Sequence, residues 1–376
     1  MGLHLIPNNL NIDFVGFRKV SYIISILIIL AGMVSLVAKG GPSYGIDFAG
    51  GATIQVRFEK PISDEEVKQS LEKSKLPDLV VQQFGDDGRG YLLRISATEE
   101  SSTGLDQVVR GALDTQLQGV SYQIEKLEMV GPKVGADLRA KALEAMYFAI
   151  LLMAIYVSGR FEYRWLAAGM VAVVLGGGMF GLEFGAEALG LPGLNKMIMV
   201  FLAIILTVLL CWKFRLVFAL GAIISILHDV LITVGIFSIL DKEFDLTIIA
   251  ALLTLAGYSL NDTIIVYDRI RENLRNDTVS PLAEIINKSI NQTLSRTVLT
   301  SGTTLLVIVA LLFWGGGVIF DFSLVMFIGV LVGTASSIFV ASPVLLAFSD
   351  TIDRNSFRPR EDKRARDSDG RIAAQV

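Results

Sequence analysis

The sequence has little cysteine, little charge and none of the common catalytic motifs. Its one cysteine, Cys211, excludes a disulfide within the chain and a metal site built on several cysteines. Charged residues make up 19% of the 376 residues, and no basic patch lies away from the chain ends, which argues against a nucleic-acid partner. Phosphate-binding loops, zinc-ligand spacings and a Ser/His/Asp arrangement with a suitable nucleophile are also missing. We therefore expect no enzymatic activity, no cofactor and no metal site.

Apolar residues are plentiful instead. Hydrophobic residues make up 52% of the chain and the mean hydropathy is +0.58, which is typical of a membrane protein. Runs of about 18 or more mostly apolar residues predict membrane-spanning helices. We find eight runs, at residues 20–38, 143–158, 165–182, 197–212, 216–239, 246–267, 298–314 and 322–347. No small-residue cleavage site follows the first run, so it predicts a retained helix rather than a signal peptide.

Lysine and arginine are distributed unevenly between the loops that join these runs. Basic residues precede the first run and follow the second, fourth, sixth and last runs, whereas the opposite loops are mostly acidic, as at 240–245. The positive-inside rule then predicts that both termini are cytoplasmic. The expected layout is a cytoplasmic segment 1–19, a transmembrane bundle over residues 142–348 and a charged cytoplasmic tail 349–376.

Residues 39–141 form the only large hydrophilic segment, and it lies on the exported side. Alternating apolar residues predict strands, and Ser63 with Glu66 forms a capping box before a helix. The expected elements are strand 52–59, helix 64–74, strands 78–84 and 90–96, helix 103–117 and strand 121–130. This β-α-β-β-α-β order is typical of a ferredoxin-like domain, either a binding module or a spacer. The fold class is thus a polytopic α-helical membrane protein with one exported α+β domain.

Ionisable residues lie inside two of the apolar runs. His228 and Asp229 are near the middle of the fifth run, and Asn261 and Asp262 lie in the sixth. Consecutive helices joined by a short loop pack antiparallel, which places Asp229 near the membrane midplane and Asp262 nearer the cytoplasm. Because a charge in the membrane is costly, such residues commonly mark proton or ion pathways.

Asp268 and Arg269 follow Asp262 toward the cytoplasm. Asp262 and Arg269 are seven residues apart and are expected on one helix face, which predicts a polar ladder from Asp229 to the inner surface. A structural role is the alternative, since a buried acid can be a hydrogen-bonded node and Asp268 and Arg269 can be interfacial anchors. Small-residue stretches at 300–305 and 333–342 predict close packing of helices.

Several stretches along the chain form a recognisable set of motifs. The stretches "YGIDFAGG" (44–51), "LHDV" (227–230) and "GYSLNDTIIVYDRIREN" (257–273) resemble the signature and core motifs of the SecF branch of the SecD/SecF family of protein-export membrane proteins. Residues 11–19 and 295–308 resemble the same family. The resemblance covers nearly the whole chain.

This resemblance implies a fold of the resistance-nodulation-division (RND) superfamily, with six membrane helices and a periplasmic ferredoxin-like domain. It implies a bacterial cytoplasmic-membrane protein that uses the proton-motive force in late steps of protein translocation. The implied partners are SecD, the SecYEG channel, YajC, the unfolded polypeptide in transit and membrane lipid. The intramembrane carboxylate of the His-Asp-Val motif carries onto Asp229, beside His228, and the other polar core positions carry onto Asn261, Asp262, Asp268 and Arg269.

The signature residues Gly45, Asp47, Phe48, Gly50 and Gly51 lie between the first helix and the first strand. Glycine permits a tight bend or a close backbone approach, so we expect a hinge between the exported domain and the membrane helices.

The chain departs from the family pattern at residues 165–212, where a two-helix insertion is expected. Two other classes of function compete with protein export. An autonomous RND-type exporter of small hydrophobic substrates is the first, although a full exporter has two six-helix halves and two exported domains. A purely structural membrane scaffold is the second, and Asp229 and Asp262 argue against it because apolar residues would suffice there.

Overall fold

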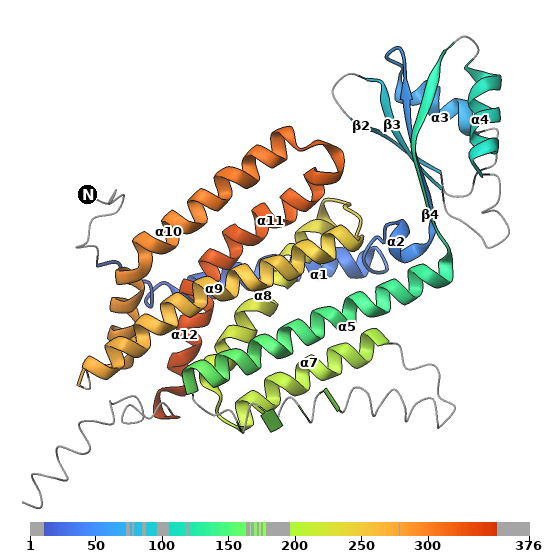
Figure 1. The fold of residues 1–376 in the computed structure, drawn as a ribbon. Coiled ribbons are helices and arrows are strands. Elements are labelled where there is room, and N and C mark those ends of the chain that lie inside the picture. The colour runs from blue at the N-terminus through green and yellow to red at the C-terminus, as the bar shows by residue number, and fades with distance from the viewer. Residues whose placement is uncertain are drawn as a thin grey trace, which may run out of the picture.

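The computed structural model describes most of the chain. The described residues are 11–72, 76, 79–84, 88–95, 105–117, 120–162, 196–277 and 279–351, together with positions 166, 169, 170, 173, 176 and 177. Within them, six helices are long and apolar enough to cross a membrane, and they form a bundle with a small sheet domain at one end (Figure 1).

Each of these six helices matches one of the predicted apolar runs. They are α1 (Arg18–Ala38), α5 (Pro132–Val157), α8 (Val217–Ile239), α9 (Leu246–Asn276), α10 (Leu282–Trp314) and α11 (Gly316–Ser336). Short helical turns prolong two of them: a π-helix at Ser158–Glu162 after α5, and after α11 a π-helix at Ser337–Ala341, α12 (Ser342–Val344) and a 3-10 helix at Leu345–Thr351. Six of the eight predicted runs are thereby confirmed as membrane-length helices.

The other two predicted runs lie in the expected insertion. The run 197–212 forms helix α7 (Lys196–Lys213), whose apolar part Val200–Lys213 is shorter than the six spans. The run 165–182 lies mostly outside the described residues, so the insertion as a whole stays a prediction.

Helices α5 and α7 both end beside the start of α8. Glu162, just after α5, accepts a hydrogen bond from the backbone N–H of Phe218 in the first turn of α8, with 2.8 Å between nitrogen and Oε1. Helix α7 is joined to α8 by only residues 214–216. Helices α5 and α7 therefore run in the same direction, as the expected pair of extra spans requires.

The sheet domain has the predicted order of elements. They are β1 (Gly51–Phe58), α3 (Asp64–Glu72), β2 (Val80–Phe84), β3 (Gly90–Ile95), α4 (Leu105–Gln116) and β4 (Tyr122–Val130). The strands lie in the order β2-β3-β1-β4 and each neighbouring pair is antiparallel, which confirms the split βαβ plan. Alternate residues of the inner strand β1, among them Ile54 and Val56, form a core with Val67 of α3 and Leu113 of α4 on one face of the sheet.

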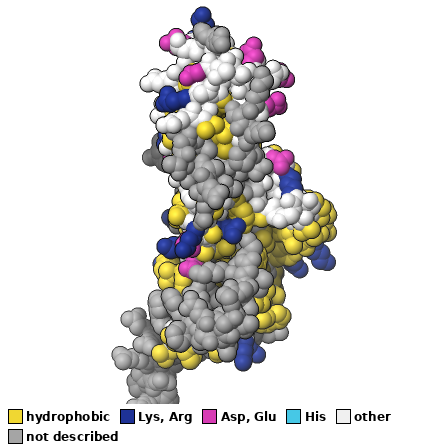
Figure 2. All heavy atoms as spheres, turned by 90° about the vertical axis from the view of Figure 1, so that its right-hand side faces the viewer, with side chains coloured by type: hydrophobic (Ala, Val, Ile, Leu, Met, Phe, Trp, Pro, Cys, Tyr) yellow, Lys and Arg dark blue, Asp and Glu magenta, His cyan; other side chains and the backbone are white. Residues whose placement is uncertain are grey.

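The surface of the bundle is apolar. Helix α1 exposes Ile23, Leu27 and Val34, and the end of α10 exposes Phe313 and Trp314. Figure 2 shows charged side chains gathered on the sheet domain and hydrophobic side chains on the bundle below it. A surface of this kind fits lipid around the helices, as in a multi-pass membrane protein.

The chain bends sharply at Gly50 and Gly51, between α2 (Ile46–Ala49) and β1. Their φ angles are +80° and +144°, where residues with a side chain are rarely found. A Cβ atom on Gly50 would lie 2.7 Å from Cα of Pro132, and one on Gly51 would lie 2.7 Å from the carbonyl oxygen of Ile95. The two glycines therefore let the chain pass close to the start of α5 and to the end of β3.

The signature segment binds the loop between α8 and α9. Phe244 of that loop donates its backbone N–H to Ser43 and accepts a hydrogen bond from Gly45, each with an N···O distance of 2.8 Å. The carboxylate of Asp47 accepts the N–H of Leu246, the first residue of α9, at 3.0 Å. An acidic side chain at the start of a helix stabilises it, so the signature residue Asp47 fixes one end of α9.

Ion pairs also connect the loop between α8 and α9 to the sheet domain and to the helix bundle. Glu243 pairs with Arg94 of β3, and Asp241 pairs with Lys39 after α1 at 2.6 Å. A movement of α8 or α9 would therefore act directly on the sheet domain.

Helices α1 and α8 pack side by side in the same direction. Gly32 and Gly235 meet so closely that a Cβ on Gly32 would lie 2.5 Å from Cα of Gly235. One turn further along, the hydroxyl groups of Ser35 and Ser238 are 2.9 Å apart. Both contacts join residues that differ by 203 in number, so the two helices run in register.

Candidate functional site

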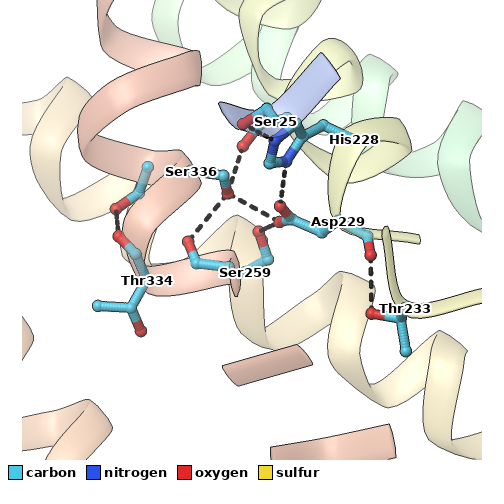
Figure 3. A network of polar contacts seen from close by, with 10 residues as sticks. Ser25, His228, Asp229, Thr233, Ser259, Thr334 and Ser336 are labelled. Atoms are coloured by element: carbon cyan, nitrogen blue, oxygen red, sulfur yellow. Dashed lines mark hydrogen bonds and ion pairs between the residues drawn. The ribbon is translucent and has the colours of Figure 1, made fainter. Parts of the chain in front are cut away.

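Asp229 lies in the middle of α8 and has no exposed surface. Its Oδ2 accepts hydrogen bonds from the hydroxyl groups of Ser259 on α9, at 2.5 Å, and Ser336 on α11, at 2.8 Å. Its Oδ1 lies 2.9 Å from Nδ1 of His228. Figure 3 shows side chains from neighbouring helices converging on this carboxylate.

The partners of Asp229 suit more than one protonation state. An ionised carboxylate is tolerated in the interior only when it is hydrogen-bonded. Hydroxyl groups and a neutral imidazole can each donate or accept, so the same groups can also accept the proton of a neutral acid. Ser225 supports the arrangement by donating to Ser336 at 2.9 Å, and Thr233 donates to the backbone carbonyl of Asp229 at 2.8 Å. The site can therefore hold a carboxyl group with or without its proton.

Gly333 on α11 lets the three helices approach. A Cβ atom at this position would lie 3.0 Å from Cβ of Ser259 and 3.4 Å from Oδ2 of Asp229. Small residues at helix contacts allow such close packing within a membrane. The small-residue stretch 333–342 thus has the packing role that the sequence indicates, and it also supplies Ser336 to the carboxylate.

Asp262 is the second buried carboxylate, with 1% of its surface exposed. Its Oδ2 accepts hydrogen bonds from Ser301 of α10 at 3.2 Å and from Thr334 of α11 at 3.4 Å. The hydroxyl oxygens of Thr334 and Ser301 also lie 2.8 Å apart. Since Thr334 and Ser336 are two residues apart, α11 contacts both carboxylates and is the element that they share. No hydrogen bond joins the two carboxylates directly among the described residues.

The remaining charged residues of the expected pathway lie further along α9. Asp268 pairs with Arg160 at 2.6 Å, and both side chains are more than 40% exposed. Arg269 pairs with Glu272 and donates to Gln292, each at 2.6 Å. These contacts fit the alternative of interfacial anchors.

Asn261 is adjacent to Asp262 in sequence but lies on an exposed face of α9. Within the described part of the chain, no hydrogen bond joins Asn261 or Arg269 to Asp262. A relay through these two residues therefore stays a prediction.

Sequence patterns did not assign four of the residues that contact the carboxylates or His228. They are Ser25, Ser301, Thr334 and Ser336. Three of these lie in or beside the small-residue stretches 300–305 and 333–342, which were interpreted as packing motifs. The number of hydroxyl groups in those stretches could have indicated a polar role, because close helix packing requires only that the side chains be small.

Family models match both parts of this architecture. The model described as protein export membrane protein SecD/SecF, C-terminal, matches residues 111–176 and 187–351, and the SecD/SecF GG motif matches residues 34–62. A protein translocase subunit SecF from Magnetococcus marinus is 40% identical to this chain, over 89% of this chain and 91% of that protein. The chain belongs to the SecF family.

Other members of the SecF family agree in length. The protein translocase subunit SecF of Calditerrivibrio nitroreducens is 36% identical over 90% of this chain and 95% of its own. Among solved structures, SecDF from Thermus thermophilus, a translocon-associated membrane protein, superposes with a TM-score of 0.64 and 31% identity, over 93% of this chain. A super-membrane-facing form of SecDF gives a TM-score of 0.55 and 30% identity, over 98% of this chain. The chain spans about two fifths of the length of these SecDF chains.

Proposed function

We propose that this SecF family member is a subunit of the Sec protein-export machinery that uses the proton-motive force, together with SecD, to promote late steps of translocation. The observation that carries the proposal is the fully buried Asp229, held by three hydroxyl or imidazole groups inside a membrane bundle. Such an intramembrane carboxylate is costly without a function.

SecD is the first partner that this function requires. The solved relatives are named SecDF, and this chain matches about two fifths of each. A separate SecD would supply the other half of the bundle, and SecYEG, YajC and the translocating polypeptide complete the proposed assembly. An autonomous exporter of small molecules is not favoured, because the SecF relatives match this chain over 91% and 95% of their own lengths.

Protonation of Asp229 would be the energy-converting step. A proton removes the negative charge from the contact between α8, α9 and α11, so it changes which packing of these helices is favoured. Asp262, bound by the same α11, would pass or balance charge toward the cytoplasm. The loop 240–245, bonded to the signature segment and to Arg94, would carry the helix movement to the exported domain.

Reconstitution tests this function directly. Inverted membrane vesicles with SecYEG, SecD and this chain should export a substrate protein faster when a proton gradient is imposed, and an uncoupler should remove the gain. Vesicles that lack only this chain are the control. Equal stimulation without the chain would reject the proposal, and gradient-driven transport without SecD would instead support the autonomous exporter.

The proposed topology places both termini in the cytoplasm and the insertion 165–212 as two spans. A reporter fused after Glu187 should then lie outside and one fused after Lys213 should lie inside. Protease accessibility of the C-terminal tail in inverted vesicles checks the termini independently. If both reporters give the same side, the insertion does not cross the membrane as two helices.

A further inference from the structure

His228 connects the buried carboxylate to α1. Its Nδ1 lies 2.9 Å from Oδ1 of Asp229, and its Nε2 lies 2.8 Å from the hydroxyl oxygen of Ser25. The imidazole is 11% exposed, so protein groups rather than bulk water satisfy its two nitrogens. Figure 3 shows the imidazole lying between the serine and the aspartate.

The two hydrogen bonds of His228 are linked by the chemistry of the ring. A neutral imidazole carries one proton, so one nitrogen donates and the other accepts. When Asp229 is ionised, Nδ1–H donates to it and Nε2 accepts the proton of the Ser25 hydroxyl. When Asp229 is protonated and donates to Nδ1, the ring proton lies on Nε2 and Ser25 must accept. The two states of the carboxylate thus require opposite roles from Ser25.

We propose that Ser25 is a positioning residue for the proton step at Asp229. Its hydroxyl group can donate or accept, so it satisfies His228 in both tautomers and lets the carboxylate gain and lose a proton without leaving a buried nitrogen unpaired. This inference rests on the proposed function. It adds α1, which otherwise presents mostly apolar side chains, to the helices α8, α9 and α11 whose packing responds to protonation of Asp229.

The packing of α1 fixes Ser25 at this place. Ser25 lies two helical turns before Gly32, and His228 lies two turns before Gly235, so the close contact of the glycines sets the distance between serine and imidazole. Ser25 and His228 differ by 203 in number, as Gly32 and Gly235 do.

The other groups that face this pair are hydroxyl groups. Ser259 from α9 and Ser336 from α11 contact Asp229, and α8 carries no further charged side chain. Titratable neighbours on the packed helices are Tyr22 of α1 and three residues of α9. Those on α9 are Tyr258, which donates to Thr304, Tyr267, which donates to the carbonyl oxygen of Ala341, and Asp262, which is bound by Ser301 and Thr334. A change in the tautomer of His228 therefore reports mainly the protonation state of Asp229.

The sequence allows the tautomer to be observed directly. It contains two histidines, so His4→Gln leaves His228 as the only one. The His4→Gln chain, labelled with ¹⁵N-histidine and reconstituted with SecD in lipid, is studied by solid-state NMR over a range of pH. We expect the ring proton to move from Nδ1 to Nε2 as Asp229 is protonated. In Ser25→Ala the proton should stay on Nδ1, since Nε2–H would lack an acceptor, and Ser25→Thr should restore the change.

Ser35→Ala is the matched control. Ser35 makes the same kind of contact between α1 and α8, to Ser238 at 2.9 Å, but touches neither His228 nor Asp229. It should leave the tautomer change intact. Gradient-stimulated export should fall roughly ten-fold in Ser25→Ala, as expected when a buried nitrogen loses its partner in one state, and only slightly in Ser35→Ala.

The outcomes separate this inference from the proposed function. If Ser25→Ala keeps the tautomer change, or if Ser35→Ala abolishes it equally, Ser25 is only a packing residue and the inference is wrong. If Asp229→Asn retains full gradient stimulation, the proton-carrying role of Asp229 in the proposed function fails. If Asp229→Asn loses gradient stimulation while Ser25→Ala keeps normal stimulation and a normal tautomer change, the inference about Ser25 is wrong and the proposed function stands.

Discussion

Vesicles that contain the Asp229→Asn chain should show no stimulation of export by a proton gradient. Asparagine has the shape of aspartate, and its carbonyl oxygen can still accept hydrogen bonds from Ser259 and Ser336. Its amide group can donate to Nδ1 of His228. The packing of α8, α9 and α11 should therefore be kept, and the variant should assemble with SecD. What it lacks is a group that takes up and releases a proton.

Asp262→Asn should have a milder effect. Asp229 is in the middle of α8, whereas Asp262 lies about 24 Å along α9 from the end next to the sheet domain, nearer the proposed cytoplasmic side. Its two hydroxyl contacts, at 3.2 Å and 3.4 Å, are also longer than those of Asp229. We expect reduced but measurable gradient stimulation in this variant.

Asp137→Asn is a suitable control for both changes, because Asp137 is an exposed carboxylate of α5 outside the network. The measurement is the ratio of export with and without the gradient, at equal amounts of assembled complex. A normal ratio in Asp229→Asn would leave Asp229 as a structural hydrogen-bonded node. A larger loss in Asp262→Asn than in Asp229→Asn would transfer the proton-carrying role to Asp262.

The helices and the sheet domain followed from local patterns in the sequence. Alternation along residues 52–59 and the capping box at Ser63 predicted a strand and a helix, and both lie within about two residues of the observed β1 and α3. A split βαβ sheet then follows because few topologies accommodate this order of elements. The buried carboxylates were also foreseeable, since charge within a long apolar run stands out.

The partners of the carboxylates could not be predicted in the same way. Spacing places Asp262 and Arg269 on one helix face, but Arg269 is bound by Glu272 and Gln292, which are closer polar partners. Ser25 is 203 residues from His228, and only the packing of α1 against α8 brings them together. Periodicity describes one helix at a time, whereas hydrogen bonds between helices depend on their relative register.

Replacing Gly50 and Gly51 by valine should impair export severely. Both glycines have positive φ angles, and each added Cβ would lie 2.7 Å from a backbone atom, of Pro132 and Ile95 respectively. Forcing a side chain into such conformations costs about 1–3 kcal/mol per residue, before the steric contacts are counted. The strain falls on the junction, so the bundle helices and their assembly with SecD should be preserved.

Gly131→Ala is the matched control at the same junction, because Gly131 has a φ of −67° and open space around a Cβ atom. We measure gradient-stimulated export and co-purification with SecD for both variants. Loss of export in an assembled complex of the valine variant, with normal export in Gly131→Ala, would support a required movement or fixed placement of the domain at this bend. Wild-type export in the valine variant would count against the hinge, because the close contacts of Gly50 with Pro132 and of Gly51 with Ile95 would then be dispensable. The sheet domain is also bound to the helices through the ion pair of Arg94 with Glu243, so a strained bend should misplace that contact as well.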